Sequence, residues 1–201
     1  MITTEYKVNC TNEIPNNSSI AIVSDLHEFN PEPVLSKLAE IQPDVIAVPG
    51  DLFENHEFGE NLDKEVLAAA NVKLLNNSSV QIKNFLFGGI PSKQITGKID
   101  SDFLKRFSNM AGYKVLLCHH PEYYPKLRNY SIHLFLSGYC HGGQIRVCGR
   151  GIFAPGQGLF PRYHHGVYEG RLVVSAGCSN TASIPRWGNE PEVVVVRFSK
   201  D

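Results

Sequence analysis

The sequence predicts an α/β fold in one domain spanning residues 1–201. Two observations support this prediction. Short apolar runs rich in β-branched residues recur along the chain between polar or glycine-containing segments, which is typical of buried strands. Between two of these runs lies a stretch with apolar residues at helical spacing, the order expected of a parallel βαβ unit. With 42% hydrophobic and 19% charged residues, the chain can bury a full core.

The βαβ unit is expected over residues 20–50. Ile20–Val23 is the first predicted strand, after a polar Asn-Asn-Ser-Ser segment. A helix should follow, because Asn30 can cap it, Pro31 suits its first turn, and apolar residues recur at positions 34, 35, 38 and 41. Val45–Val48 is the second strand, and we expect it to lie parallel to the first.

Further elements follow in order along the chain. A helix capped by Asp63 should extend to about Ala70, and the runs at 72–75 and 79–82 predict a hairpin or paired strands. A helix capped by Asp100 or Ser101 is also expected. Additional strands are predicted at 85–87, 115–117, 133–136, 172–175 and 193–198. The glycine-rich segment 138–158 favours tight turns between short strands over a nucleotide-binding fingerprint.

Polar residues with metal-binding side chains follow several of these strands. Asp25 and His27 come after the first strand, and Asp51 comes after the second. Parallel neighbours end at the same edge of a sheet, about 4.8 Å apart per strand, so these three side chains should meet there. Carboxylate and imidazole groups bind divalent first-row cations well. The sequence therefore predicts a metal site at this edge.

Such a site suits hydrolysis of a phosphate ester. Two divalent ions about 3.5–4 Å apart can activate water and neutralise charge on the phosphoryl group. We expect Asp51 to bridge them, with Asp25, His27 and His141 completing the shell of one ion. For the second ion the sequence offers Asn55 and His119. His56 could then act as a general acid on the leaving group.

Several spaced segments, in order, resemble the motif series of the calcineurin-like metallophosphoesterases: Asp25-x-His27, Gly50-Asp51, Asn55-His56-Glu57, His119 and Gly138-x-x-His141. The stretch from Ser137 to Phe160 is similar to the bacterial YkuE-type branch of that family. The resemblance covers nearly the whole chain. It implies two mixed β-sheets packed as a sandwich and flanked by helices, with manganese, iron or zinc as the metal.

Two departures from the family pattern stand out. Asp51 and Asn55 are only four residues apart, which indicates an internal deletion of a βα segment of roughly 30 residues and a shortened sheet that must close up or expose an edge. Tyr139 stands where the family has a histidine for the second metal, and a phenol is a poor substitute for imidazole. We therefore expect one firmly bound ion, a weaker second one, and reduced or altered catalysis.

Other residues leave alternatives open. His119 and His120 are adjacent, and the family pattern favours His119 as the ligand, with His120 packing or contacting substrate. Gln144 and Arg146 could contact phosphate or could be loop residues at the surface. The rival reading of the whole chain is a degenerate family member that binds metal or a partner without catalysis. A Cys-His nucleophile built on Cys118 or Cys140 fits the spacing poorly.

The amino-acid composition narrows the cellular compartment and the kinds of binding partner expected for this protein. The formal net charge of -1 gives no reason to expect nucleic-acid binding through bulk electrostatics. Five cysteines without CxxC spacing favour reduced thiols in a cytoplasm over a disulfide framework. No apolar run is long enough for a membrane helix, and no secretory signal is evident. We expect a cytoplasmic protein that acts on a small-molecule or lipid phosphoester, with homodimer formation favoured if a sheet edge is exposed.

Overall fold

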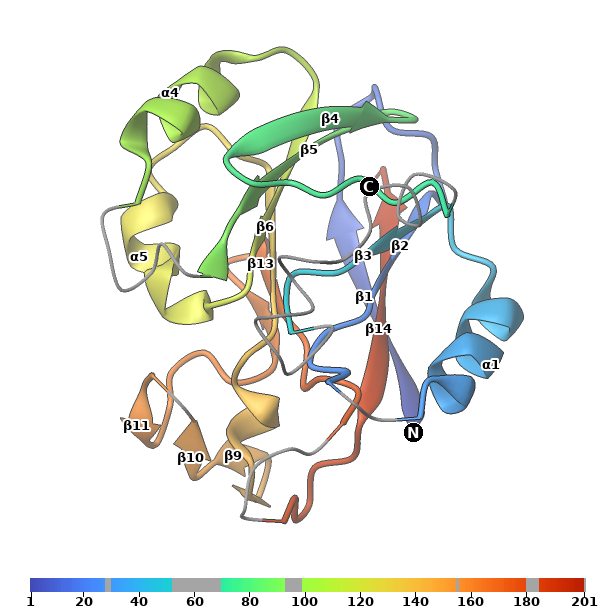
Figure 1. Ribbon diagram of the computed structural model, residues 1–201, viewed down its shortest axis with the longest axis vertical. Coiled ribbons are helices and arrows are strands. Elements are labelled where there is room, and N and C mark those ends of the chain that lie inside the picture. The colour runs from blue at the N-terminus through green and yellow to red at the C-terminus, as the bar shows by residue number, and fades with distance from the viewer. Residues whose placement is uncertain (28–29, 52–69, 93–98, 155, 180–184, 201) are drawn as a thin grey trace.

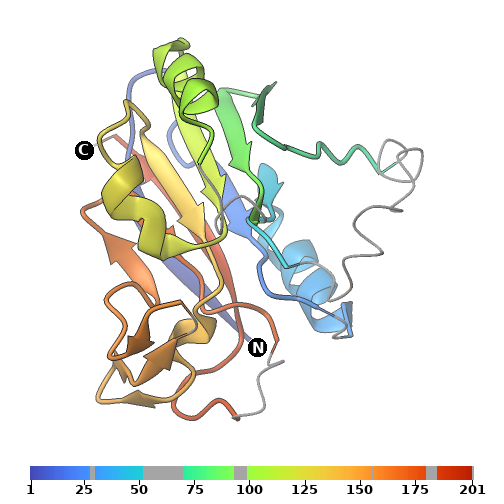
Figure 2. The same ribbon diagram turned by 60° about the vertical axis from the view of Figure 1, so that its left-hand side comes forward.

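The computed structural model describes residues 1–27, 30–51, 70–92, 99–154, 156–179 and 185–200. Its architecture is α/β, with two larger mixed sheets and two small hairpins. Figure 1 shows the larger sheets as adjacent layers, with helix α1 (Glu32–Ile41) on one flank and helices α4 (Ser101–Asn109) and α5 (Tyr124–Leu127) on the other. The turned view in Figure 2 keeps these helices on opposite sides. The described fold therefore agrees with the two-sheet sandwich expected from the sequence.

The first sheet has the strand order β1–β14–β2–β3. Strand β1 (Ile2–Asn9) is parallel to β14 (Glu192–Ser199), which is antiparallel to β2 (Ser19–Ile22). Strand β2 is parallel to β3 (Val45–Ala47), which confirms the pairing predicted for the βαβ unit. Among the described residues, β3 forms one edge of this sheet.

Helix α1 forms where the spacing predicted it. The side-chain oxygen of Asn30 accepts a hydrogen bond of 3.1 Å from the backbone N–H of Glu32, although Pro31 and not Asn30 stands at the N-cap position. Val34 is buried, whereas Leu35 is 53% exposed, so the apolar face is narrower than the sequence indicated. This face packs on the outer side of the first sheet, against Ala21, Val23, Cys178 and Val193.

The second sheet has the strand order β12–β13–β7–β6–β5–β4. Its centre is parallel: β5 (Phe85–Ile90), β6 (Tyr113–Cys118), β7 (Leu134–Ser137) and β13 (Leu172–Val174). Both edge strands are antiparallel to their neighbours: β4 (Ser78–Ile82) and β12 (Gly166–Tyr168). Since β6 and β7 are parallel, the segments that follow them leave the sheet at the same edge.

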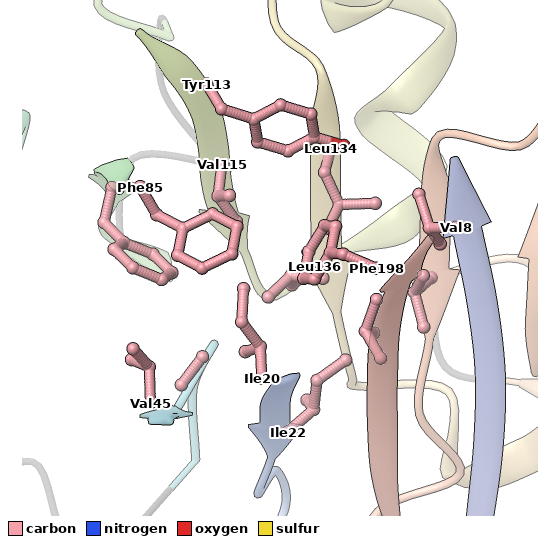
Figure 3. Packing of buried hydrophobic residues seen from close by; sticks show 14 of the residues in the cluster. Val8, Ile20, Ile22, Val45, Phe85, Tyr113, Val115, Leu134, Leu136 and Phe198 are labelled. Atoms are coloured by element: carbon pink, nitrogen blue, oxygen red, sulfur yellow. The ribbon is translucent and has the colours of Figure 1, made fainter. Parts of the chain in front are cut away.

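The core between the two sheets forms because side chains alternate along each strand. Ile20 and Ile22 point into it from β2, while Ala21 lies on the opposite face. Leu134 and Leu136 point into it from β7. Figure 3 shows side chains from both sheets meeting in this layer. Apolar burial here joins the sheets into one sandwich and fixes which strand ends lie side by side.

Helices cover the outer face of the second sheet. Asp100 caps α4, because its side chain accepts hydrogen bonds from the backbone N–H groups of Asp102 and Phe103 at 3.0 and 2.9 Å. The buried residues of α4 and α5 pack on side chains that alternate with those of the central core: Leu86, Leu116, Phe135, Leu172 and Val174. The short 3-10 helix η2 (Pro121–Tyr123) leads into α5.

Short strands occupy the glycine-rich region, as predicted. After the 3-10 turn η3 (His141–Gly143), β8 (Arg146–Val147) pairs with β9 (Arg150–Gly151), and β10 (Phe153–Ala154) pairs with β11 (Gly158–Leu159).

Two parts of the structure differ from what the sequence predicted. The run at 72–75 forms no strand, and β4 pairs instead with β5. Strand β1 was not predicted, because its side chains alternate in exposure and form no apolar run. The helix expected from Asp63 lies largely outside the described residues.

Candidate metal centre

The loops after β2 and β3 are joined by backbone hydrogen bonds. The N–H groups of Leu26 and His27 donate to the carbonyl oxygen of Asp51 at 2.9 and 3.1 Å, and the N–H of Asp25 donates to Gly50 at 3.4 Å. The parallel pairing of β2 with β3 places these loops together. Asp25, His27 and Asp51 therefore meet at one sheet edge, as the sequence predicted.

The loops after β6 and β7 close on the same place from the second sheet. The N–H of Gly138 donates to the carbonyl of His119 at 3.0 Å. The N–H of Tyr139 donates to both carboxylate oxygens of Asp25, at 3.1 and 3.3 Å. The candidate site is thus built where the strand ends of both sheets converge.

Two groups of side chains at this convergence could hold a metal ion. One consists of Asp25, His27 and His141, and the other of Asp25, Asp51 and His119. Within each group the donor atoms lie within 4.8 Å of one another. Asp25 belongs to both groups, so the bridging role expected of Asp51 stays a prediction.

Individual distances show how closely Asp25 approaches the histidines. Its Oδ1 lies 3.8 Å from Nε2 of His119 and 3.7 Å from Nε2 of His141. The rings of His27 and His141 stack with centroids 5.9 Å apart. Mixed oxygen and nitrogen donors of this kind could hold a divalent metal ion.

The side chain of Asp25 packs so closely against Gly138 and Gly177 that neither position has room for a Cβ atom. Its side chain is 0% exposed, and Ser24 donates to its Oδ2 at 2.7 Å. A Cβ added at Gly138 would lie 2.6 Å from Oδ2, and one added at Gly177 would lie 2.8 Å from the same oxygen. Among the described residues, no lysine or arginine makes an ion pair with this carboxylate. Burial of a carboxylate is costly, and a divalent cation would offset that cost more fully than the imidazoles of His119 and His141, which lie 3.8 and 3.7 Å from Oδ1.

The backbone is strained at four members of the two groups. Asp25, His27, Asp51 and His141 have φ values of 52°, 52°, 51° and 43°. Residues other than glycine seldom adopt this left-handed region, and such strain clusters at functional sites. The loops are therefore shaped to present these side chains at some cost in stability.

Asp51 and His119 interact as an acid–base pair. Nε2 of His119 lies 3.0 Å from Oδ2 of Asp51. Burial alone would raise the pKa of Asp51, but its close contact with His119 and the other nearby histidines outweigh burial and lower it. Burial alone would lower the pKa of His119, yet the interactions with Asp51 and Asp25 raise it. Both shifts favour the charged pair in the absence of metal.

The predicted ligand His141 is contacted by two residues that the sequence did not single out, Arg186 and Asn189. The side chain of Asn189 donates to the backbone carbonyl of His141, and Nη2 of Arg186 lies 3.3 Å from its Nδ1. Burial lowers the pKa of His141, Asp25 opposes this, and Arg186 adds to the lowering. Arg186 and Asn189 lie in the segment 185–200, in which the sequence shows no motif, so only the fold reveals their contacts with His141.

The three predicted substrate-contacting residues have different surroundings. His120 is part-buried, with its Nδ1 3.1 Å from Glu122 and its ring centroid 3.8 Å from that of Tyr139. Gln144 is buried. Arg146 donates through Nε to the carbonyl of Gly142 at 2.8 Å and through Nη2 to Asn189. Arg146 thus supports the His141 loop, and its contact with phosphate stays a prediction.

Asn55 and His56 lie outside the described residues, so their proposed roles as second-site ligand and general acid stay predictions. Tyr139 borders the second group, with its ring centroid 5.3 Å from that of His119. Its backbone positions Asp25, while its ring packs on His120. The site where the resemblance implies a histidine is therefore occupied by an aromatic side chain in van der Waals packing.

Cys118 and Cys140, the two cysteines considered as nucleophiles, lie in buried surroundings that disfavour the reactive thiolate. None of the five cysteines forms a disulfide. Burial raises the pKa of Cys118 to about 12 and that of Cys140 well above its usual value. Both thiols are therefore protonated at neutral pH, whereas the thiolate is the reactive form.

No helix in the described ranges combines the length and apolar character needed to cross a membrane. Comparison of the chain with models of known families, with curated proteins and with solved structures gives no match.

Proposed function

We propose that this chain is a metal-dependent phosphoester hydrolase of the calcineurin-like type, in which activated water attacks phosphorus directly. One observation carries the proposal: the buried carboxylate of Asp25 belongs to two groups of metal-binding side chains at the converging strand ends. The motif order in the sequence and the two mixed sheets support the same assignment.

A divalent manganese, iron or zinc ion would supply a Lewis acid that makes water nucleophilic near neutral pH and neutralises phosphoryl charge. Asp25, His27 and His141 would hold the firmly bound ion. Asp51 and His119, with Asp25, would hold a second one. The hydrogen bonds from Ser24 and Tyr139 keep the Asp25 carboxylate oriented for both roles.

The substrate proposed is a small-molecule or lipid phosphoester, and the compartment proposed is the cytoplasm. Hydrolysis of an aryl phosphate by the purified chain, with manganese or zinc added and then removed by chelation, tests the proposal. We expect activity that depends on metal and that is lost in the Asp25→Asn variant. Metal analysis that finds less than one equivalent after growth with added manganese and zinc would count against it.

Tyr139 favours a second candidate, a degenerate relative that binds metal or a partner with little or no catalysis. Its ring packs against His120, at the border of the second group, where the resemblance implies a metal-binding imidazole. Metal binding with no hydrolysis of aryl monoesters or diesters would support this second candidate over the first.

A further inference from the structure

Arg186 contacts the candidate metal centre through only part of its guanidinium group. Its Nη2 donates to the backbone carbonyl of Ser179 and lies 3.3 Å from Nδ1 of His141. Its Nε and Nη1 are buried and have no hydrogen-bond partner among the described residues. Native structures leave few buried donors unpaired, so these two require an explanation other than support of the Ser179 loop.

The contact with His141 favours one tautomer of a neutral ring. A guanidinium can only donate, so Nδ1 of a neutral His141 must accept, and Nε2 then carries the hydrogen. Nε2 is the nitrogen on the side of Asp25, 3.7 Å from Oδ1. An ion held by Asp25 would need the lone pair of Nε2, which moves the hydrogen to Nδ1, where it opposes Nη2 of Arg186. Metal binding and the Arg186–His141 contact are therefore antagonistic.

The charge of Arg186 lacks a close carboxylate partner within the described chain. Burial lowers the pKa of Arg186 to about 10, while Asp25 acts in the opposite direction, so the side chain stays charged at neutral pH. A part-buried arginine beside a metal centre attracts an anion, and planar guanidinium donors match phosphoryl oxygens.

We propose that Arg186 binds an anionic oxygen of the substrate phosphoryl group, and that its contact with His141 gives way when a metal ion takes the ring. The inference rests on the proposed function, since it assumes that the metal and a phosphoryl group occupy this centre. It predicts effects of opposite sign. Arg186 weakens the binding of the cation alone and strengthens the binding of the anion to the metal-loaded protein.

The test measures binding by calorimetry rather than turnover, with Mn²⁺ alone and then with inorganic phosphate added to the Mn²⁺-loaded protein. The variants are Arg186→Gln, Arg186→Lys and the control Arg106→Gln, which removes an exposed arginine from α4. We expect Arg186→Gln to bind Mn²⁺ about three- to tenfold more tightly, because a repelling charge is gone. It should bind phosphate about ten- to a hundredfold more weakly, because charge-assisted hydrogen bonds are lost. Arg186→Lys should lie between, and the control should match the native chain.

Each result has a distinct meaning. If the native chain binds Mn²⁺ and phosphate but Arg186→Gln binds phosphate within twofold of it, the inference fails and the proposed function stands. If Arg186→Gln loses Mn²⁺ and phosphate together, Arg186 serves only to hold the loop, and the inference fails. If the native chain binds no Mn²⁺, the proposed function itself is wrong.

Discussion

Replacement of Asp25 by asparagine tests the candidate metal centre most directly, because Asp25 belongs to both groups of donor atoms. Asparagine keeps the size of the side chain, so the close approaches of Gly138 and Gly177 are preserved. Its oxygen can still accept from the N–H of Tyr139, and its amide can donate to Ser24. The change therefore removes a negative charge and leaves the packing intact.

The size of the effect follows from linkage between metal binding and folding. An ion present at 100 times its dissociation constant stabilises the native state by about 2.7 kcal/mol. For a domain of this length, each kcal/mol shifts Tm by about 2–4 °C. Saturating metal should therefore raise the Tm of the native chain by about 5–11 °C. In Asp25→Asn this rise should vanish, while the Tm of the metal-free protein should change little, because the removal of a buried charge is offset by the loss of its attraction to charged His119.

Differential scanning calorimetry with and without chelator measures both quantities. Asp44→Asn is the matched control, because Asp44 pairs with Lys83 at 2.6 Å and accepts from the N–H of Ser19 at 2.9 Å, away from the centre. That control should lose up to about 1 kcal/mol of stability and keep the full metal-dependent rise. A full rise in Asp25→Asn would show that the metal binds elsewhere and would refute the reasoning.

Three further predictions concern the same centre. Gly138→Ala would place a Cβ 1.8 Å from Oγ of Ser24, so it should cost about 1–3 kcal/mol and abolish the metal-dependent rise in Tm; an unchanged rise would contradict the close packing around Asp25. Tyr139→His should increase the bound metal measured by elemental analysis from about one equivalent towards two, and no change would mean that Tyr139 does not limit the second site. In metal-free protein, the lowered pKa of Asp51 means that this carboxylate contributes to the free energy of unfolding above about pH 4 and that the contribution is lost on acidification. The raised pKa of His119 means that this imidazole contributes to the free energy of unfolding below about pH 6.5 and that the contribution is lost as pH rises. The loss in unfolding free energy on His119→Gln, measured with urea, should therefore be largest between about pH 4 and 6.5 and decline towards pH 9, and a flat profile would show that the pair adds nothing.

The parts of the fold that sequence reasoning found are those with a local signal. Strand β2, helix α1 and strand β3 each carry an apolar pattern of their own, and the crossover between them fixes a parallel pair. Strand β1 gives no such signal, because only Val8 of its eight residues is buried. Its place is decided by pairing with β14 at the far end of the chain.

In the candidate site, too, some residues could be predicted from local signals and others could not. Asp25, His27 and Asp51 could be predicted to meet, since each follows a strand of one parallel unit. Arg186 and Asn189 could not be predicted, because they lie more than forty residues from His141 and carry no spacing motif. The shared position of Asp25 was also missed, since it depends on how far the loops of the second sheet reach towards the first.

The amino-acid sequence by itself determined the α/β character of this protein, the strand ends that carry carboxylates and imidazoles, and the order of those residues along the chain. These features follow from local periodicity and from the shared edge of parallel strands. Only the tertiary structure decided that Asp25 is buried between two glycines, that His119 pairs with Asp51, and that Arg186 reaches His141. Those contacts join loops from different sheets, and burial of the core between the sheets sets the distance between the loops.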